Sequence, residues 1–342
     1  MHIADLDERD LELLHGLQIA PRVGWAEAAR ILGTTPATLA ARWRRLRSAG
    51  LAWVTAHPGG DYSRIMLALI EVDCLPGARA EVVRALCLDP RAVTVEEATR
   101  GRDLLLTVIA PDLAALAAFA LDDLDRLPGV ERQRTHLVTA VHRDGGAWRL
   151  NALSRPQQQA FAAAAAATRP VPGVTPPPNA WPLIEALAHD GRRTATDLAA
   201  LTGRNPATVR RQLGRLLASG LLSFRCEIAQ PVSGSPISCT WMGRVAAAEH
   251  ERTVAAIATL PELKMCVSTT GDTNIAFTVW ARSVSDLLRL ERLIGERLPW
   301  LRLHESGVNL RTPKRMGWLL DAAGHATGEV VPPAGHLSLG AG

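Results

Sequence analysis

The sequence predicts an α+β protein with two winged helix-turn-helix domains and two ferredoxin-like (βαββαβ) domains in tandem. Three observations predict this fold class. A segment near the N-terminus recurs 170 residues later, each copy has the caps and apolar spacing of a helix-turn-helix, and each is followed by the same alternation of strands and helices. The chain is therefore expected to be a duplication of one module.

The repeat is visible by direct alignment. Segments 33–51 and 203–221 align without a gap and share eight identities in nineteen positions. The identical pairs are Gly33/Gly203, Pro36/Pro206, Ala37/Ala207, Thr38/Thr208, Arg45/Arg215, Leu46/Leu216, Gly50/Gly220 and Leu51/Leu221. Agreement at this density indicates a duplication.

The first helix-turn-helix is expected within residues 1–58. Leucines at helical spacing predict a first helix, and a second helix over 25–32 ends at Gly33, a favourable residue for a helix C-terminus. Thr35 followed by Pro36 predicts the N-cap and first turn of a third helix, which Gly50 ends. Residues 51–56 have strand character and are expected to form a wing.

The second copy, within residues 180–230, follows the same plan. A helix over 196–202 ends at Gly203, and Asn205 followed by Pro206 begins the third helix. Residues 221–228 again have strand character, as a wing requires.

The polar face of each third helix predicts a DNA contact. An α-helix fits the major groove, where arginine can bond guanine and other polar side chains can bond base edges or phosphates. The candidate DNA-binding residues are Thr35, Thr38, Arg42, Arg44, Arg45 and Arg47 in copy one, and Asn205, Thr208, Arg210, Arg211, Gln212 and Arg215 in copy two. Gly214 stands where copy one has Arg44, which predicts a less basic second helix. The alternative is a solvated helix face whose arginine stems cover the core.

Each helix-turn-helix is followed by a βαββαβ pattern. Copy one predicts strands at 64–73, 92–99, 103–110 and 130–142 and helices at 78–88 and 113–127. Copy two predicts strands at 237–242, 263–270, 275–281 and 302–310 and helices at 247–260 and 284–298. The expected domains are 1–58, 62–150, an Ala/Pro-rich linker at 151–179, 180–230, 235–321 and a flexible tail at 322–342.

This order of elements resembles the Lrp/AsnC (feast/famine) family of bacterial transcription regulators over nearly the whole chain. The resemblance implies that the α+β halves are sensor domains, which dimerise through their sheets and bind amino acids or related small effectors between paired halves. In that family the loop between the second and third strands carries a TGDYD-like motif. The corresponding residues are Gly271, Asp272, Thr273 and Asn274 after Thr270 in copy two, and Gly101, Arg102 and Asp103 after Arg100 in copy one.

These loop residues are the candidate effector site. The glycine permits a tight turn whose N–H groups can meet a carboxylate, and the aspartate can pair with an ammonium group. Copy two keeps more of the motif and is the better candidate. A plain hairpin turn is the alternative, because Gly-Asp is a common turn pair.

Two sensor halves in one chain are expected to pair with each other as an intrachain pseudo-dimer. One polypeptide then presents two unlike recognition helices to an asymmetric double-stranded DNA site. The rival is pairing between chains, which produces a homodimer with four reading heads.

The composition limits the other possibilities. The chain has 342 residues, of which 47% are hydrophobic and 21% charged, with a net charge of +4, as in a globular protein that permits an acidic partner. The acidic N-terminus lacks a signal-peptide pattern, and no run of 18 apolar residues occurs. Five cysteines without a CxxC pair favour a reducing compartment over disulfides or a zinc site. The chain is expected to be cytoplasmic, without a membrane partner.

An enzyme is the main alternative to a regulator. Tandem proteins that resemble this one include sirohaem decarboxylases, which use the paired α+β halves as an active site. Here Tyr62 is the one tyrosine, and the histidines show no spacing typical of metal ligands or of a base and nucleophile. No catalytic residue, metal or cofactor is therefore expected. A third possibility, an effector-binding protein without DNA binding, requires neutral third helices, and the arginines argue against it.

Overall fold

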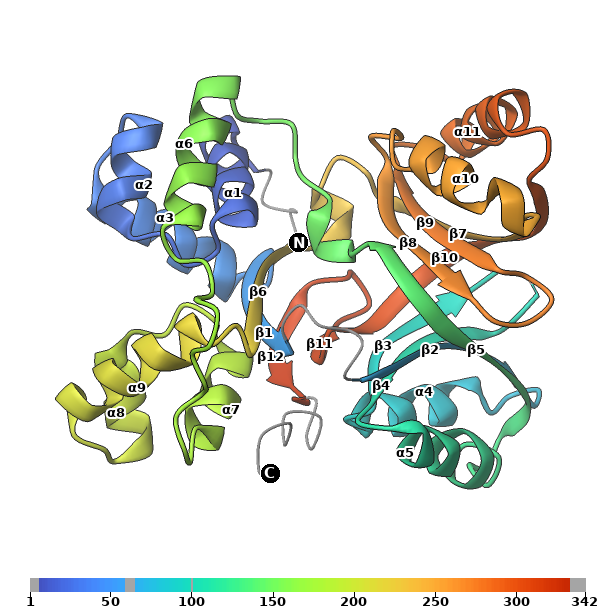
Figure 1. Ribbon diagram of the computed structural model, residues 1–342, viewed down its shortest axis with the longest axis horizontal. Coiled ribbons are helices and arrows are strands. Elements are labelled where there is room, and N and C mark those ends of the chain that lie inside the picture. Colours follow the sequence, from blue (N-terminus) through green and yellow to red (C-terminus); the bar gives the residue numbers. More distant parts are fainter. Residues whose placement is uncertain (1–5, 59–64, 100, 333–342) are drawn as a thin grey trace.

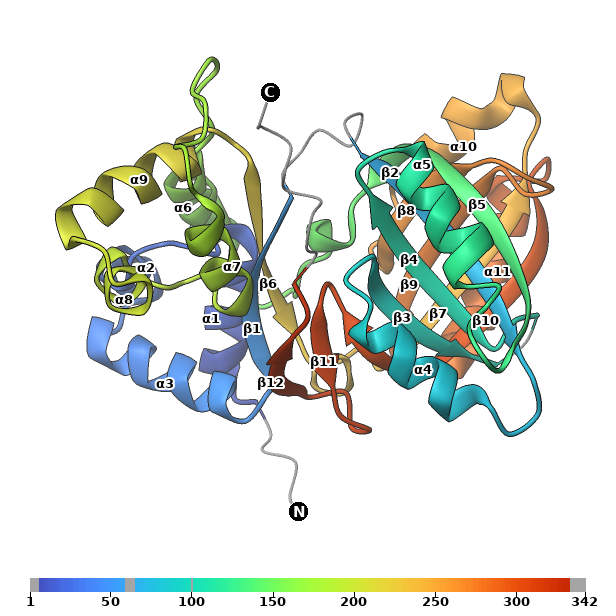
Figure 2. The ribbon, with the colours of Figure 1, turned by 90° about the horizontal axis from the view of Figure 1, so that it is seen from below.

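The two helix-turn-helix segments lie at one end of the molecule and the two α+β segments at the other (Figures 1 and 2). This computed structural model describes residues 6–58, 65–99 and 101–332. Its fold confirms the predicted α+β class and the order of elements in both copies. Among the described residues, no helix is both long and apolar enough to cross a membrane.

The first helix-turn-helix consists of α1 (Glu8–Ile19), α2 (Trp25–Leu32) and α3 (Pro36–Ser48). The caps lie where the sequence predicts them. Gly33 ends α2 in the left-handed conformation with a φ of 63°, and the Thr35 side chain accepts a hydrogen bond from the Thr38 amide at the start of α3. Leu39, Trp43 and Leu46 bury the inner face of α3.

The second helix-turn-helix consists of α7 (Trp181–His189), α8 (Ala195–Thr202) and α9 (Pro206–Ala218). Gly203 ends α8 with a φ of 64°, and the Asn205 side chain caps α9. The same sequence signals therefore produce the same turns in both copies.

The strands that follow the third helices pair with each other. β1 (Ala52–Pro58) and β6 (Leu222–Ile228) form an antiparallel two-stranded sheet, in which Val54 lies opposite Cys226. The strands occur where the sequence predicts them, but each takes its partner from the other copy and not from a wing hairpin of its own. Buried residues from both copies cover this sheet, which explains why it is stable between the copies.

Two arginines lock the helix-turn-helix copies together. Arg22 donates to the carbonyls of Gly191 and Arg193, and Arg192 donates to the carbonyls of Pro21 and Val23. Arg22 and Arg192 are separated by the 170-residue repeat, so the contact is reciprocal. It joins the turn between α1 and α2 to the turn between α7 and α8.

The predicted linker contains a structural helix. α6 (Arg155–Ala166) packs on α1 and α2, and its Phe161 is fully buried in the core of the first helix-turn-helix. A Cβ added to Gly16 would lie 2.4 Å from the ring of Phe161. Residues 155–166 therefore belong to the first helix-turn-helix, and the linker is shorter than the sequence predicts.

Each α+β half has the predicted βαββαβ order. Copy one contains β2 (Met66–Cys74), α4 (Arg79–Leu88), β3 (Ala92–Ala98), β4 (Leu104–Ala110), α5 (Leu113–Ala117) and β5 (Val130–Arg143). Copy two contains β7 (Ile237–Arg244), α10 (His250–Ile257), β8 (Leu263–Thr269), β9 (Ile275–Ala281), α11 (Val284–Arg297) and β10 (Arg302–Arg315). α4 and α5 pack on one sheet, and α10 and α11 pack on the other (Figure 1).

The two sheets close into one barrel within the chain. The strand order is β10-β3-β4-β2-β5-β8-β9-β7, and β7 pairs again with β10. The copies join through β5 with β8 and through β10 with β3, both antiparallel. The two sensor halves therefore pair with each other, as the intrachain alternative requires.

Residues 322–332 include a strand that pairs with the segment before Asp321. β11 (Trp318–Leu320) pairs with β12 (Ala326–Val330), and the Ala326 amide donates to the carbonyl of Gly50 at 2.9 Å. The prediction of a flexible tail from residue 322 is therefore wrong for 322–332, because this strand packs on the helix-turn-helix end. Residues 333–342 of that prediction lie outside the described residues.

Candidate nucleic-acid interface

The outer face of α9 carries two exposed arginines that have fewer internal contacts than the other predicted arginines of α3 and α9. Arg210 and Arg211 are exposed, and neither forms an ion pair with an acid in the described part of the chain. A Cβ at Gly214 would meet nothing within 4 Å, so this side of the helix is open. The Asn205 cap and Pro206 leave the N-terminus of α9 exposed as well.

Other predicted residues of α9 hold the preceding segment. Arg215 donates through Nε to the carbonyl of Thr175 and through Nη2 to its hydroxyl, both at 2.8 Å. Gln212 accepts from Arg204 at 3.3 Å, and Thr208 is half-buried. These contacts leave Arg210 and Arg211 as the side chains most available to another molecule.

On α3, acids of α1 engage two of the predicted arginines. Arg42 contacts both Asp7 at 2.7 Å and Asp10 at 2.9 Å, and Arg45 contacts Asp10, which is 1% exposed. The hydrogen bond from Arg42 lowers the pKa of Asp7. The prediction that Arg42 faces outward needs correction, because its guanidinium lies against the capping box of α1; Arg45 is 46% exposed at its side chain.

The remaining predicted residues of α3 are exposed. Arg47 pairs with Asp190 of the second copy at 2.7 Å, whereas the contact of Arg44 within the described ranges is a 3.4 Å hydrogen bond to the carbonyl of Ala40. The hydroxyls of Thr35 and Thr38 bond each other at 2.8 Å. The two third helices therefore differ in how much of their positive charge is already paired, which the sequence pattern did not indicate.

The predicted effector loop of copy two is anchored by its own side chains. Asn274 accepts from the Val245 amide at 2.9 Å and donates back to the Val245 carbonyl at 2.8 Å. Thr273 is buried, and its hydroxyl has no partner among the described residues. Gly271 has a φ of 108°, and Asp272 is exposed.

The predicted effector loop of copy one is also anchored by its own side chains. Asp103 accepts from the Cys74 amide at 2.8 Å, as Asn274 does from Val245. The Arg102 side chain is fully buried and pairs with Glu305 at 2.8 Å and with Glu71 at 3.5 Å. The prediction that Arg102 contacts an effector needs correction, since its guanidinium holds β10 of the other copy. The carbonyl of Gly101 accepts from Arg134.

A buried acid and a histidine join the two loops. His136 donates through Nε2 to the Glu71 carboxylate at 2.7 Å and through Nδ1 to the carbonyl of Thr270 at 3.3 Å. Burial raises the pKa of Glu71, but the His136 hydrogen bond and the nearby arginines outweigh it and lower that pKa to about 2. The hydrogen bond to Glu71 raises the pKa of His136 above 6.5.

This pair predicts a loss of stability above neutral pH. Because the pKa of His136 is raised in the folded state, its contribution is complete below pH 6.5 and disappears as the pH rises through the folded pKa. The free energy of unfolding, measured with urea, is expected to fall between pH 6 and pH 9, and to fall less in Glu71→Gln. An equal fall in both proteins would assign the effect to other groups.

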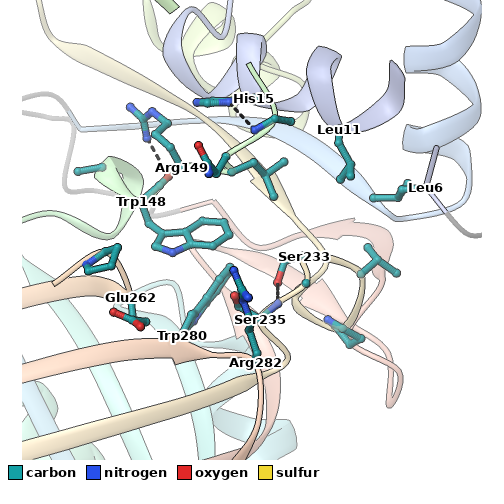
Figure 3. Close-up of a pocket in the computed structure, with 18 of the residues that line it drawn as sticks. Leu6, Leu11, His15, Trp148, Arg149, Ser233, Ser235, Glu262, Trp280 and Arg282 are labelled. Carbon is teal, nitrogen blue, oxygen red and sulfur yellow. Dashed lines mark hydrogen bonds between the residues drawn. The ribbon is translucent and has the colours of Figure 1, made fainter. Parts of the chain in front are cut away.

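A large cleft separates the first helix-turn-helix from the second sensor half (Figure 3). Its volume is about 1550 Å³, and His15 and Leu11 of α1 line one side. On the other side the rings of Trp148 and Trp280 meet with centroids 4.8 Å apart. The sequence patterns did not indicate this cleft, because its walls come from five segments that are distant in the chain.

A second, smaller cavity of about 130 Å³ lies inside the barrel. Trp280 lines both spaces, and Glu96, Lys264 and Arg315 contribute charged groups to the smaller one. Neither cavity is lined by the residues of the two predicted effector loops. Glu96 follows Val95 in the ordinary alternation of a strand, so the sequence carried no signal for the smaller cavity.

Three family models match parts of the chain. The AsnC-type helix-turn-helix domain matches residues 6–47, the Lrp/AsnC ligand binding domain matches residues 67–148, and the IclR helix-turn-helix domain matches residues 179–225. The matches thus include the helix-turn-helix of both copies.

Two curated relatives are each one module long. An uncharacterised helix-turn-helix transcriptional regulator of Pyrococcus furiosus is 30% identical over 145 residues, which are 41% of this chain and 96% of the relative. The regulator FL11 of Pyrococcus horikoshii is 31% identical over 144 residues, which are 41% of this chain and 93% of the relative.

A solved structure matches nearly the whole chain. The siroheme decarboxylase NirDL has a TM-score of 0.56 and 14% identity, and the match covers 90% of this chain and 93% of that one. At this identity the likeness shows a shared fold of both modules.

Proposed function

The chain belongs to the Lrp/AsnC family of DNA-binding transcription regulators, and we propose that one polypeptide reads an asymmetric DNA site through two unlike helices, α3 and α9. The observation that carries this proposal is the exposed, unpaired Arg210 and Arg211 on a capped helix. Arg44 and the two threonines of α3 form the second reading surface. The remaining paired arginines, Arg45, Arg47 and Arg215, exchange an internal partner for a phosphate on binding.

The reading unit in this proposal is the intrachain pseudo-dimer. The closed barrel and the reciprocal Arg22 and Arg192 contacts support it, because they hold both copies together without a second chain. A homodimer with four heads is the rival. Sedimentation at micromolar concentration separates the two, and a species of twice the chain mass would contradict a monomeric reader.

We propose further that the chain acts in the cytoplasm, responds to a small effector and has no catalytic role. The relatives named as regulators support this. The fold shared with a siroheme decarboxylase and the cleft of about 1550 Å³ favour the enzyme as a second candidate. A purified protein that carries a tetrapyrrole absorption band, or that decarboxylates added siroheme, would overturn the non-catalytic proposal.

The experiment that tests DNA reading is selection of bound fragments from the source genome, followed by fluorescence anisotropy on the enriched site. A regulator is expected to bind that site at least about 10³-fold more tightly than random DNA. Its logarithmic affinity should fall linearly with the logarithm of salt concentration, by about 0.9 for each phosphate contacted. Binding that is weak and equal for all sequences would contradict the proposal.

A further inference from the structure

The cavity inside the barrel is lined mainly by apolar side chains and has charged side chains on one wall. Seven strands of the barrel contribute to it, together with one residue each from β1 and β6, and aliphatic side chains form most of its surface. These side chains include Leu67, Leu69, Leu105, Ile109, Val141, Met265 and Val267. Its volume of about 130 Å³ corresponds to about four water molecules, so the occupant is a small molecule and not a macrocycle.

Lys264 supplies a cation with open bonding capacity. Its side chain is 14% exposed and its ammonium lies 4.1 Å from the ring centroid of Trp280. The nearest carboxylate oxygen, on Glu227, is 3.7 Å away, and within the described ranges the ammonium makes no hydrogen bond shorter than 3.5 Å. An ammonium has three donors, and desolvation lowers the pKa of Lys264 to about 8.

The neighbouring charges leave this wall positive. Arg315 also lies near the Trp280 ring, with its guanidinium carbon 5.1 Å from the ring centroid, and its hydrogen bonds to Ile228 and Gln230 are both 3.4 Å long. Glu227 is the acid that Lys264, Arg315 and Arg225 share, and Arg225 also pairs with Asp144, which lines the cavity. Three cations thus face the two acids Glu227 and Asp144. Glu96 accepts from Asn309, and burial raises its pKa, which favours its neutral form.

We propose that this cavity binds a small aliphatic carboxylate, with the carboxylate on Lys264 and Arg315 and the hydrocarbon against the leucine and valine wall. A carboxylate completes the ammonium donors of Lys264 and balances the excess of one cation over the acids Glu227 and Asp144. The aliphatic wall favours a short hydrocarbon body over a polar one. The site is distinct from both motif loops, which do not line it.

The position of the cavity connects it with both recognition helices. Its lining includes His57 of β1 and Arg225 of β6, the strands that directly follow α3 and α9. The Nε of Arg225 donates to His57 at 2.7 Å, across the two strands. A bound carboxylate shifts the β1–β6 sheet and, with it, the position of α3 relative to α9. This regulatory role of the ligand rests on the proposed function, whereas the binding of the ligand does not.

The test uses the full chain without DNA, titrated by calorimetry with 4-methylpentanoate and, separately, with its neutral amide, 4-methylpentanamide. The acid is expected to bind saturably and at least about tenfold more tightly than the amide. Lys264→Met keeps the bulk over Trp280 and removes the charge, and is expected to bind the acid no better than the amide. Arg292→Met, an exposed position on α11, is the matched control and is expected to bind like the unchanged protein.

No saturable binding up to about 10 mM, or equal binding of acid and amide, would overturn the site. Unchanged affinity in a folded Lys264→Met would also overturn it. The comparison of acid with amide on the unchanged protein needs no variant, so an unfolded Lys264→Met leaves a decisive measurement. DNA binding is measured in a separate assay: its absence would contradict the regulator, whereas calorimetry alone decides the carboxylate site.

Discussion

Replacing Arg210 and Arg211 together with alanine is expected to lower affinity for the specific DNA site by about 2–4 kcal/mol, or roughly 30- to 1000-fold. Both guanidinium groups are exposed and without an acidic partner in the described chain, so neither has to break an internal ion pair to reach DNA. The measurement is anisotropy on the selected site at several salt concentrations, and the salt slope is expected to become shallower by about one for each lost phosphate contact.

The matched control removes the same charge elsewhere. Arg292 and Arg297 are exposed on α11, at the barrel end of the molecule (Figure 1). Their joint replacement by alanine is expected to change specific affinity less than about threefold, because these positions lie away from both reading helices. Equal losses in the two double variants would mean that net charge, and not α9, accounts for binding.

Replacing Phe161 with alanine is expected to lower the free energy of unfolding by about 3–5 kcal/mol. The ring is fully buried against α1, at the position left open by Gly16. Neighbouring backbone cannot move into the resulting space without shifting α1 or α6, so a cavity remains. Urea unfolding followed by circular dichroism measures the effect.

Gln159→Ala, at an exposed position of the same helix, is the control and is expected to stay within about 0.5 kcal/mol. A fall below about 1 kcal/mol in Phe161→Ala would show that α6 is only loosely attached, as a linker would be. The two substituted side chains lie on the same helix and differ in whether they are buried.

Local signals predicted most of the fold. Gly33, Gly203 and the Pro36 and Pro206 starts act within four or five residues, so their turns could be located from the chain alone. The strand over 275–281 has the predicted bounds, since every residue in it is buried. A fully apolar run between turns depends little on its partners.

Partners distant in sequence could not be predicted in this way. The alternation in β1 and β6 indicates strands but not which strand each one meets. Phe161 is one large apolar side chain in an alanine run, which gives no periodic stripe. Both elements are held by contacts that form only when the two copies meet.

In the candidate site, too, the local features could be predicted from the sequence and the long-range contacts could not. Its arginines and caps could be found from the sequence, but the pairing of Arg42 and Arg45 with Asp10 joins residues more than thirty positions apart. The burial of Arg102 depends on Glu305 in the other copy. Lys264 acquires its role from barrel closure, and nothing adjacent to it in the chain indicates a cavity.

The joining of both barrel halves in one polypeptide also removes a dissociation equilibrium. A reader made of two separate subunits falls apart on dilution, so its apparent affinity for DNA depends on how much protein is present. Here the halves stay together however scarce the molecule is, since the β5–β8 and β10–β3 seams lie within a single chain. A cell can therefore keep very few copies of it, and promoter occupancy follows copy number along a simple one-site binding curve, with no added dependence on subunit dissociation.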